Sequence, residues 1–127
     1  MSEQVARRFI DALHALERDG DLDTIVGTFA EGCDVGNVVS PRQFTGRDGA
    51  REFWSVYRET LGEVESTFRN VIATGDRAAL EWTTRGTGAN GQEIDYDGVS
   101  ILEIEGGKVR RFMAYFDTRD LTPQVVD

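Results

Sequence analysis

The chain has 127 residues, of which 14 are Lys or Arg and 23 are Asp or Glu, so its formal net charge is −9. This acidity argues against nucleic acid and membrane partners, and the length suits one domain, which we expect to span residues 1–127. A single Cys33 excludes an internal disulfide, and the sequence shows neither an apolar N-terminal signal nor a membrane-spanning apolar run, so we expect a cytoplasmic protein.

Three helices are predicted in the first half of the chain. The first covers about residues 3–18, where apolar residues recur at helical spacing: Val5, Phe9, Leu13 and Leu16. Asp21 is a suitable N-cap for a second helix, which Gly32 would end in the left-handed conformation. Thr45 followed by Asp48 resembles a capping box, and the third helix that it opens would run to Leu61.

The remaining chain is predicted to form strands joined by short turns. A first strand at 34–39 would be closed by Pro41, and strands at 64–73 and 78–85 would flank a two-residue turn at 75–76. Asn90-Gly91 predicts a second two-residue hairpin loop. The last hairpin, 96–104 with 108–117, would have a three-residue loop at 105–107, and residues 118–127 would form a loosely held tail.

These loop lengths predict which strand residues oppose each other and therefore share a face. One face would surround a cavity under the helices, because it mixes small, aromatic and ionisable side chains: Phe68, Asn70, Glu81, Thr83, Arg85, Tyr96, Gly98, Ser100, Phe112, Ala114 and Phe116. The other face would form an apolar patch that pairs two subunits into a homodimer: Leu80, Trp82, Val99, Ile101, Met113 and Tyr115. A single β-bulge would exchange the two faces locally.

The element order and three segments resemble the nuclear transport factor 2-like superfamily, and within it the SnoaL-like branch. The segments are GDLDTIVGTFAEGCDV, FTGRDGAREFW and ILEIEGGKVRRFMAYFD. This branch includes polyketide cyclases, ketosteroid isomerases and limonene epoxide hydrolases. The resemblance implies an α+β, cystatin-like cone, in which three N-terminal helices and a strongly curved mixed or antiparallel sheet surround a deep pocket. It also implies frequent dimerisation through the sheet, but no single reaction.

The catalytic residues of two relatives are mostly replaced at the matching positions. Ketosteroid isomerases use a Tyr and two Asp residues where this chain has Phe9, Asn37 and Ser100, so that mechanism is not expected. Limonene epoxide hydrolases use an Asp as the water-activating base where this chain has Ala114. Their other polar residues match Glu81, Thr83, Val35 and Asn37, of which only the Asn is retained.

Glu81 is the candidate acid or base, and Asn37 and Asn70 would hold the substrate oxygen or a water molecule. A carboxylate inside an apolar cone would have a raised pKa, which suits proton transfer near neutral pH. The alternative is a structural ion pair with Arg85, and the two interpretations have similar weight. The remaining candidate ligand-binding residues are apolar or polar side chains of the expected pocket: Phe9, Leu13, Trp54, Tyr57, Phe68, Asn70, Thr83, Arg85, Tyr96, Ser100, Phe112, Ala114 and Phe116.

Two functions remain open from the sequence. The first is a cofactor-independent isomerase, cyclase or hydrolase that acts on a small hydrophobic metabolite through Glu81. The second is a non-catalytic ligand-binding or dimerisation module of the same fold. No cofactor is expected, and the single His14, without a second His or Cys nearby, gives no metal-binding signature. Cys33 is expected to be an inert buried thiol.

Overall fold

The computed structural model describes residues 2–39 and 43–117, so the tail predicted at 118–127 and the role of Pro41 lie outside the described residues. Three helices and six strands follow one another along this part of the chain. In chain order they are α1 Ser2–Asp19, α2 Leu22–Val26, β1 Phe29–Asn37, β2 Phe44–Thr45, α3 Gly46–Leu61, β3 Glu63–Thr74, β4 Arg77–Thr87, β5 Glu93–Glu105 and β6 Lys108–Phe116.

The helix starts agree with the sequence signals, but one helix end does not. Asp21 caps α2, because its Oδ1 accepts a hydrogen bond of 3.1 Å from the backbone N–H of Thr24. This helix ends at Val26, and the predicted stop at Gly32 is wrong because Gly32 already lies within β1. Thr45 precedes α3 as expected, although its side chain makes no capping hydrogen bond.

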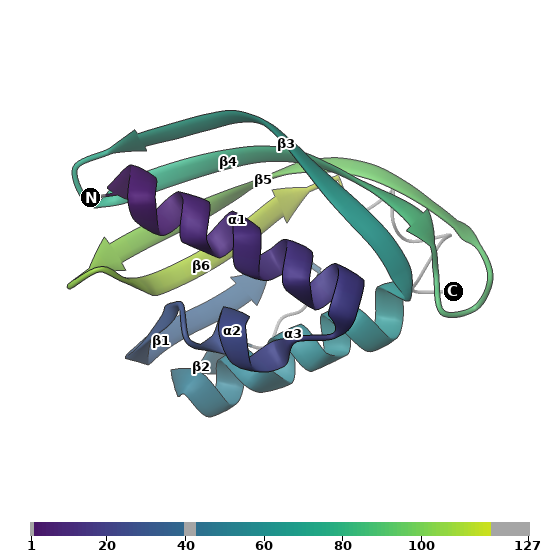
Figure 1. Cartoon of the computed structure of the whole chain (residues 1–127), viewed down its shortest axis with the longest axis horizontal. Coiled ribbons are helices and arrows are strands. Elements are labelled where there is room, and N and C mark those ends of the chain that lie inside the picture. The colour runs from purple at the N-terminus through teal and green to yellow at the C-terminus, as the bar shows by residue number, and fades with distance from the viewer. Residues whose placement is uncertain (1, 40–42, 118–127) are drawn as a thin grey trace.

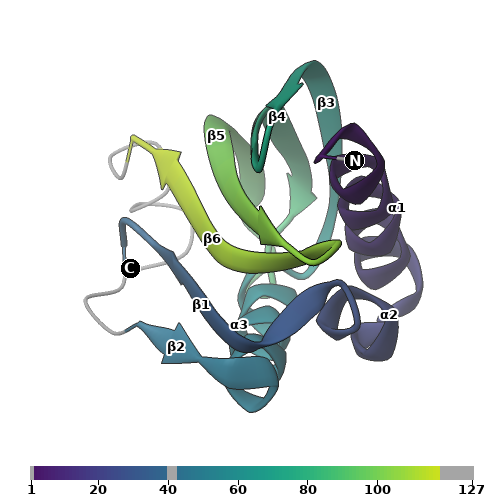
Figure 2. The same ribbon diagram turned by 90° about the vertical axis from the view of Figure 1, so that its left-hand side faces the viewer.

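The strands form one mixed sheet in the order β2-β1-β6-β5-β4-β3. Only β1 and β6 are parallel, and every other neighbouring pair is antiparallel. The sheet curves, and the helices lie along one side of it (Figures 1 and 2). We call the side of the sheet that faces the helices the inner face, and the opposite side the outer face. The observed architecture confirms the predicted α+β fold with a curved mixed sheet.

The last hairpin has a shorter loop than predicted. Glu105 opposes Lys108, so only Gly106 and Gly107 form the loop, with φ of +59° and +77°. A two-residue turn of this kind needs positive φ at both positions, which two glycines supply without steric cost. A bulge at Arg110 then makes Leu102 oppose Phe112 instead of Arg110. The register differs by two residues from the prediction, so the predicted faces of β5 and β6 are retained.

The β4–β5 loop has one residue more than predicted, and this changes the faces of β4. The backbone N–H of Gly88 donates to the carbonyl of Gln92 at 2.7 Å, and that of Gly91 donates to the carbonyl of Gly88 at 2.9 Å. The loop is therefore the three residues 89–91 and not Asn90-Gly91 alone. A shift of one residue exchanges the two faces of a strand. Inward and outward side chains of β4 are consequently the reverse of those predicted.

The β3–β4 hairpin combines a correct turn with a bulge. Thr74 opposes Arg77 across the predicted two-residue turn, and Asn70 opposes Glu81 as predicted. The register then shifts by one residue at Arg69, so that Phe68 opposes Trp82. This bulge leaves Phe68 on the inner face and Asn70 on the outer face.

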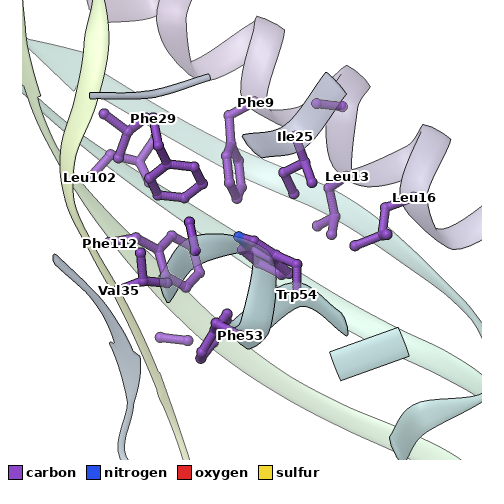
Figure 3. Packing of buried hydrophobic residues seen from close by; sticks show 14 of the residues in the cluster. Phe9, Leu13, Leu16, Ile25, Phe29, Val35, Phe53, Trp54, Leu102 and Phe112 are labelled. Carbon is purple, nitrogen blue, oxygen red and sulfur yellow. The ribbon is translucent and has the colours of Figure 1, made fainter. Parts of the chain in front are cut away.

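Aromatic rings meet in the space between the helices and the inner face (Figure 3). Phe9 of α1 lies with its ring centroid 5.4 Å from that of Phe112 and 5.9 Å from that of Trp54. On the sheet, the indole of Trp82 lies across Gly98, where an added Cβ would come within 2.5 Å of two indole carbons. The absence of a side chain at Gly98 therefore leaves room for the indole of Trp82.

The outer face is less apolar than predicted. Leu80 and Trp82 are buried on the inner face, so their predicted place in an outer patch is wrong. Four of the predicted outer residues do lie there by register: Val99, Ile101, Met113 and Tyr115. Tyr115 is 43% exposed. Pairing of two subunits through this face stays a prediction.

Candidate functional site

A cavity of about 270 Å³ lies between the helices and the inner face of the sheet. Its walls come from α1, α3 and strands β1 to β6. Most of the lining is apolar or aromatic: Phe9, Leu13, Asn37, Val39, Phe44, Phe53, Trp54, Val56, Tyr57, Thr60, Leu61, Ser66, Trp82, Thr84, Tyr96, Ser100, Phe112, Ala114 and Phe116. Within the described part of the chain, no Asp, Glu, His, Lys or Arg lines this cavity.

The structure brings most of the predicted pocket residues together. The cavity is lined by Phe9, Leu13, Asn37, Trp54, Tyr57, Tyr96, Ser100, Phe112, Ala114 and Phe116. Phe68 lies on the inner face beside His14, with ring centroids 5.9 Å apart, but it does not line the cavity. Asn37 does line it, and its Oδ1 accepts a hydrogen bond of 3.0 Å from the backbone N–H of Val39.

Glu81, Thr83, Arg85 and Asn70 do not face the cavity, so their predicted inward orientation is wrong. Because the β4–β5 loop is longer than predicted, Glu81, Thr83 and Arg85 lie on the outer face. The bulge at Arg69 places Asn70 on the outer face as well. Glu81 instead accepts a hydrogen bond from the amide of Asn70 and lies 3.5 Å from Arg69 Nε.

Arg85 and Thr83 also have partners outside the cavity. Arg85 pairs with Asp95 at 3.3 Å, so it is not the partner of Glu81 that the sequence suggested. The hydroxyl of Thr83 donates to Asp97 Oδ1 at 2.5 Å. Glu81 therefore belongs to a network of polar groups on the outer face and does not line the pocket.

Glu17 is the carboxylate that lies next to the cavity, and sequence reasoning missed it. It belongs to α1 and is only 6% exposed. One carboxylate oxygen, Oε1, accepts the backbone N–H of Ser66 at 2.9 Å. The other, Oε2, accepts the hydroxyls of Ser66 and Tyr57, each at 2.6 Å. Both partners line the cavity, so Glu17 lies directly behind its wall.

The tyrosines on this wall are held in their neutral form. Burial, followed by the negative charge of Glu17, raises the pKa of Tyr57 well above its usual value. The same two causes raise the pKa of Tyr96. Both side chains therefore present neutral hydroxyl groups next to the cavity across the physiological pH range.

The two indole N–H groups beside the cavity have different surroundings. The indole N–H of Trp82 donates to Ser100 Oγ at 2.9 Å. The indole N–H of Trp54 is buried without a hydrogen-bond partner. Figure 3 shows this nitrogen on the side of Trp54 that faces Phe9 and Phe112, where an aromatic ring can serve as a weak acceptor.

The remaining candidate groups have structural surroundings. His14 is half-buried, and its Nε2 lies 2.9 Å from the carbonyl oxygen of Ser66, to which it donates. Cys33 is buried within β1, and burial raises the pKa of its thiol. Among residues 2–39 and 43–117, no three His, Cys, Asp or Glu side chains gather as a metal site would require. None of the helices in this part of the chain could span a membrane.

The family model for the SnoaL-like domain matches residues 6–112. The chain belongs to the SnoaL-like domain family. A search of curated proteins finds no significant match to the sequence. The resemblance to the SnoaL-like branch noted from the sequence is confirmed.

Solved structures show the same fold at low sequence identity. A protein of unknown function from Burkholderia pseudomallei, described as like nuclear transport factor 2, has a TM-score of 0.87 at 21% identity, covering 99% of this chain and 98% of that one. TerC, co-crystallised with polyporic acid, has a TM-score of 0.81 at 22% identity, with coverage of 97% and 99%. A protein of ketosteroid isomerase-like fold from Catenulispora acidiphila, in complex with trimethylamine, has a TM-score of 0.80 at 15% identity, with coverage of 93% and 92%.

Proposed function

We propose that this SnoaL-like domain binds a small, largely apolar organic molecule in the cavity between the helices and the inner face. The observation that supports this function is an aromatic-lined space of about 270 Å³ that holds no ionisable Asp, Glu, His, Lys or Arg among its described lining residues. Ligand pockets are typically concave and apolar, with a few placed polar groups. Here those groups belong to Asn37, Tyr57, Thr60, Ser66, Thr84, Tyr96 and Ser100.

Two of the similar structures were solved with a small organic molecule present. TerC was co-crystallised with an acid, and the protein from Catenulispora acidiphila was solved with an amine. At these identities the likeness carries the fold alone. The chemistry of a ligand for this chain must therefore be argued from its own residues.

A cavity-filling substitution tests whether ligands occupy this space. Ala114 lines the cavity on β6, whereas its neighbour Met113 lies on the outer face. We expect Ala114→Phe to weaken binding of a neutral apolar probe such as indane by about tenfold or more, because the added ring takes the ligand's volume. Met113→Phe is the matched control and should bind as the wild type does.

Tryptophan fluorescence provides the measurement, because the two tryptophans of the chain, Trp54 and Trp82, both line the cavity. Titration with indane should change their emission saturably in the wild type and in Met113→Phe. Circular dichroism would establish that Ala114→Phe is folded. Equal affinities for the two variants, or no saturable binding by the wild type, would contradict the proposal.

Proton-transfer catalysis is a second candidate, which one observation favours. Tyr57 lines the cavity and donates to Glu17 at 2.6 Å, so a substrate C–H proton could pass to Tyr57 while the Tyr57 proton passes to Glu17. The enolate so formed would take a proton from Tyr57 at a different carbon while Glu17 returns its proton to Tyr57, as an isomerase-like step requires. Deuterium exchange at the α-carbon of 2-indanone in D₂O, followed by NMR, tests this candidate. If the candidate is correct, the wild-type protein exchanges the deuterium faster than buffer alone does, and the Tyr57→Phe variant does not.

A further inference from the structure

One end of the cavity carries a cluster of hydroxyl groups that share a single carboxylate. Ser66, Thr84 and Tyr96 are direct neighbours across β3, β4 and β5. Tyr57 reaches the same place from α3, and all four line the cavity. Glu17 lies behind them and accepts hydrogen bonds from Ser66 and Tyr57. We call these four hydroxyl groups the polar end of the cavity.

The hydrogen bonds of Glu17 define the direction of three of the four hydroxyl hydrogens in this cluster. A carboxylate only accepts hydrogen bonds, so the hydroxyls of Ser66 and Tyr57 must both donate to it. Ser66 has then used its one hydrogen, and its 2.7 Å contact with Thr84 Oγ1 requires Thr84 to be the donor. Tyr57 and Thr84 are left with lone pairs for a group in the cavity. Tyr96 can either donate or accept.

The charge of Glu17 has no cationic partner in the described part of the chain. No Lys, Arg or His there forms a salt bridge with it, although nine ion pairs of other residues are formed. Only neutral donors surround it. Its negative charge is, after burial, the second-largest cause of the raised pKa values of Tyr57 and Tyr96. Aromatic faces, which carry negative charge density, line the rest of the space. Both features favour a positively polarised group.

We propose that the polar end favours ligands whose polar group donates hydrogen bonds, a protonated amine first and a hydroxyl second, over ligands that offer only a carbonyl oxygen. An acceptor placed against Tyr57 and Thr84 would meet lone pairs, and its own lost hydration would go uncompensated. This inference rests on the proposed function, because it assumes that the cavity binds apolar molecules. The proposed function describes the apolar part of the ligand, and this inference specifies the chemistry of its polar group.

Four ligands of one shape test the selectivity of the wild-type protein: 2-aminoindane, 2-indanol, 2-indanone and indane. They share a ring system and differ in a single group that is a cationic donor, a neutral donor, an acceptor or absent. We expect the amine to bind about tenfold more tightly than the ketone, with the alcohol between them. Tryptophan fluorescence or calorimetry would give the four dissociation constants.

A substitution of the hidden carboxylate should reverse this preference. In Glu17→Gln the amide can donate to the oxygens of Tyr57 and Ser66, which turns the Tyr57 hydrogen toward the cavity. The charge that favours an amine is also lost. We therefore expect 2-indanone to gain affinity and 2-aminoindane to lose it. Glu3→Gln removes the same charge from an exposed position of α1 and should keep the wild-type order.

Tyr57→Phe keeps the test informative if Glu17→Gln fails to fold. It removes one acceptor and should weaken the amine and the alcohol severalfold while indane is unaffected. If none of the four ligands binds the wild type, the proposed function itself fails. If indane binds but the ketone binds as tightly as the amine, or if Glu17→Gln keeps the wild-type order, only the selectivity inference is overturned.

Discussion

On the inner side of the sheet, Glu17 is 6% exposed and meets only hydrogen-bond donors, whereas on the outer face the side chain of Glu81 is 37% exposed and lies 3.5 Å from Arg69. The two carboxylates are stabilised by different means. An exposed ion pair contributes little because water screens it, while a buried carboxylate must have its oxygens satisfied by nearby donors.

We therefore expect substitutions to be tolerated on the outer face of the sheet but not at the wall of the cavity. The outer-face charges form a solvated set with Asp97 and Asn70 as further neighbours. The inner carboxylate instead determines the direction of hydroxyl groups that line the cavity. The selectivity proposed for the cavity should therefore depend on Glu17, which lies behind the cavity wall, more than on the more accessible Glu81.

The largest expected effect comes from removing each carboxylate in turn. Glu17→Ala leaves the N–H and hydroxyl of Ser66 and the hydroxyl of Tyr57 without their acceptor, which should lower the free energy of unfolding by about 3 kcal/mol. Glu81→Ala should cost only about 0.5 kcal/mol, because its ion pair is exposed. Urea unfolding followed by circular dichroism would compare them. Equal losses would remove the distinction between the two faces.

A second comparison places an added methyl group on each face. In Gly98→Ala the Cβ would lie 2.5 Å from two carbons of Trp82, and 2.7 Å from the carbonyl oxygen of Tyr115. We expect a loss of about 2 kcal/mol in stability, with a shift of the Trp82 fluorescence. In Gly36→Ala the new Cβ would meet only Met113 Sδ, at an ordinary 3.7 Å. Its stability should stay within about 0.5 kcal/mol of the wild type, and a larger loss than in Gly98→Ala would contradict the packing argument.

Local signals were sufficient to predict the three helices and strands β3 to β6, but not β2, the start of β1 at Phe29 or the register of the sheet. Asp21, Thr45 and the turn at 75–76 lie where the sequence indicated. Gly91 and Gly107 can each end either a two-residue or a three-residue loop, and the sequence around them does not decide between the two. The prediction assigned the longer loop to the wrong hairpin. An error of one residue was enough to exchange the two faces of β4.

The apolar part of the site could be predicted, because it depends on helical spacing that survives small errors. Phe9, Leu13 and Trp54 reach the cavity as expected. Glu17 follows Phe9 by eight residues and Leu13 by four, which places it on the same helical face. The spacing was therefore a usable signal. A charged residue there is ordinarily assumed to be exposed, and the donors that satisfy it lie 49 residues away at Ser66 and 40 residues away at Tyr57.

A last comparison, which has no effect near neutral pH, distinguishes the tyrosines of the two faces at alkaline pH. The folded-state pKa values of Tyr57 and Tyr96 are raised, first by burial and then by Glu17, above the unfolded value of about 10. Their contribution to stability is fully present below pH ~10 and is lost as the pH rises toward the folded-state values, by up to about 1.4 kcal/mol per pH unit for each group. Tyr96→Phe should reduce this alkaline loss. Tyr115→Phe, on the exposed outer face, should retain it, and denaturant midpoints measured across the alkaline range would show whether the buried hydroxyls are responsible.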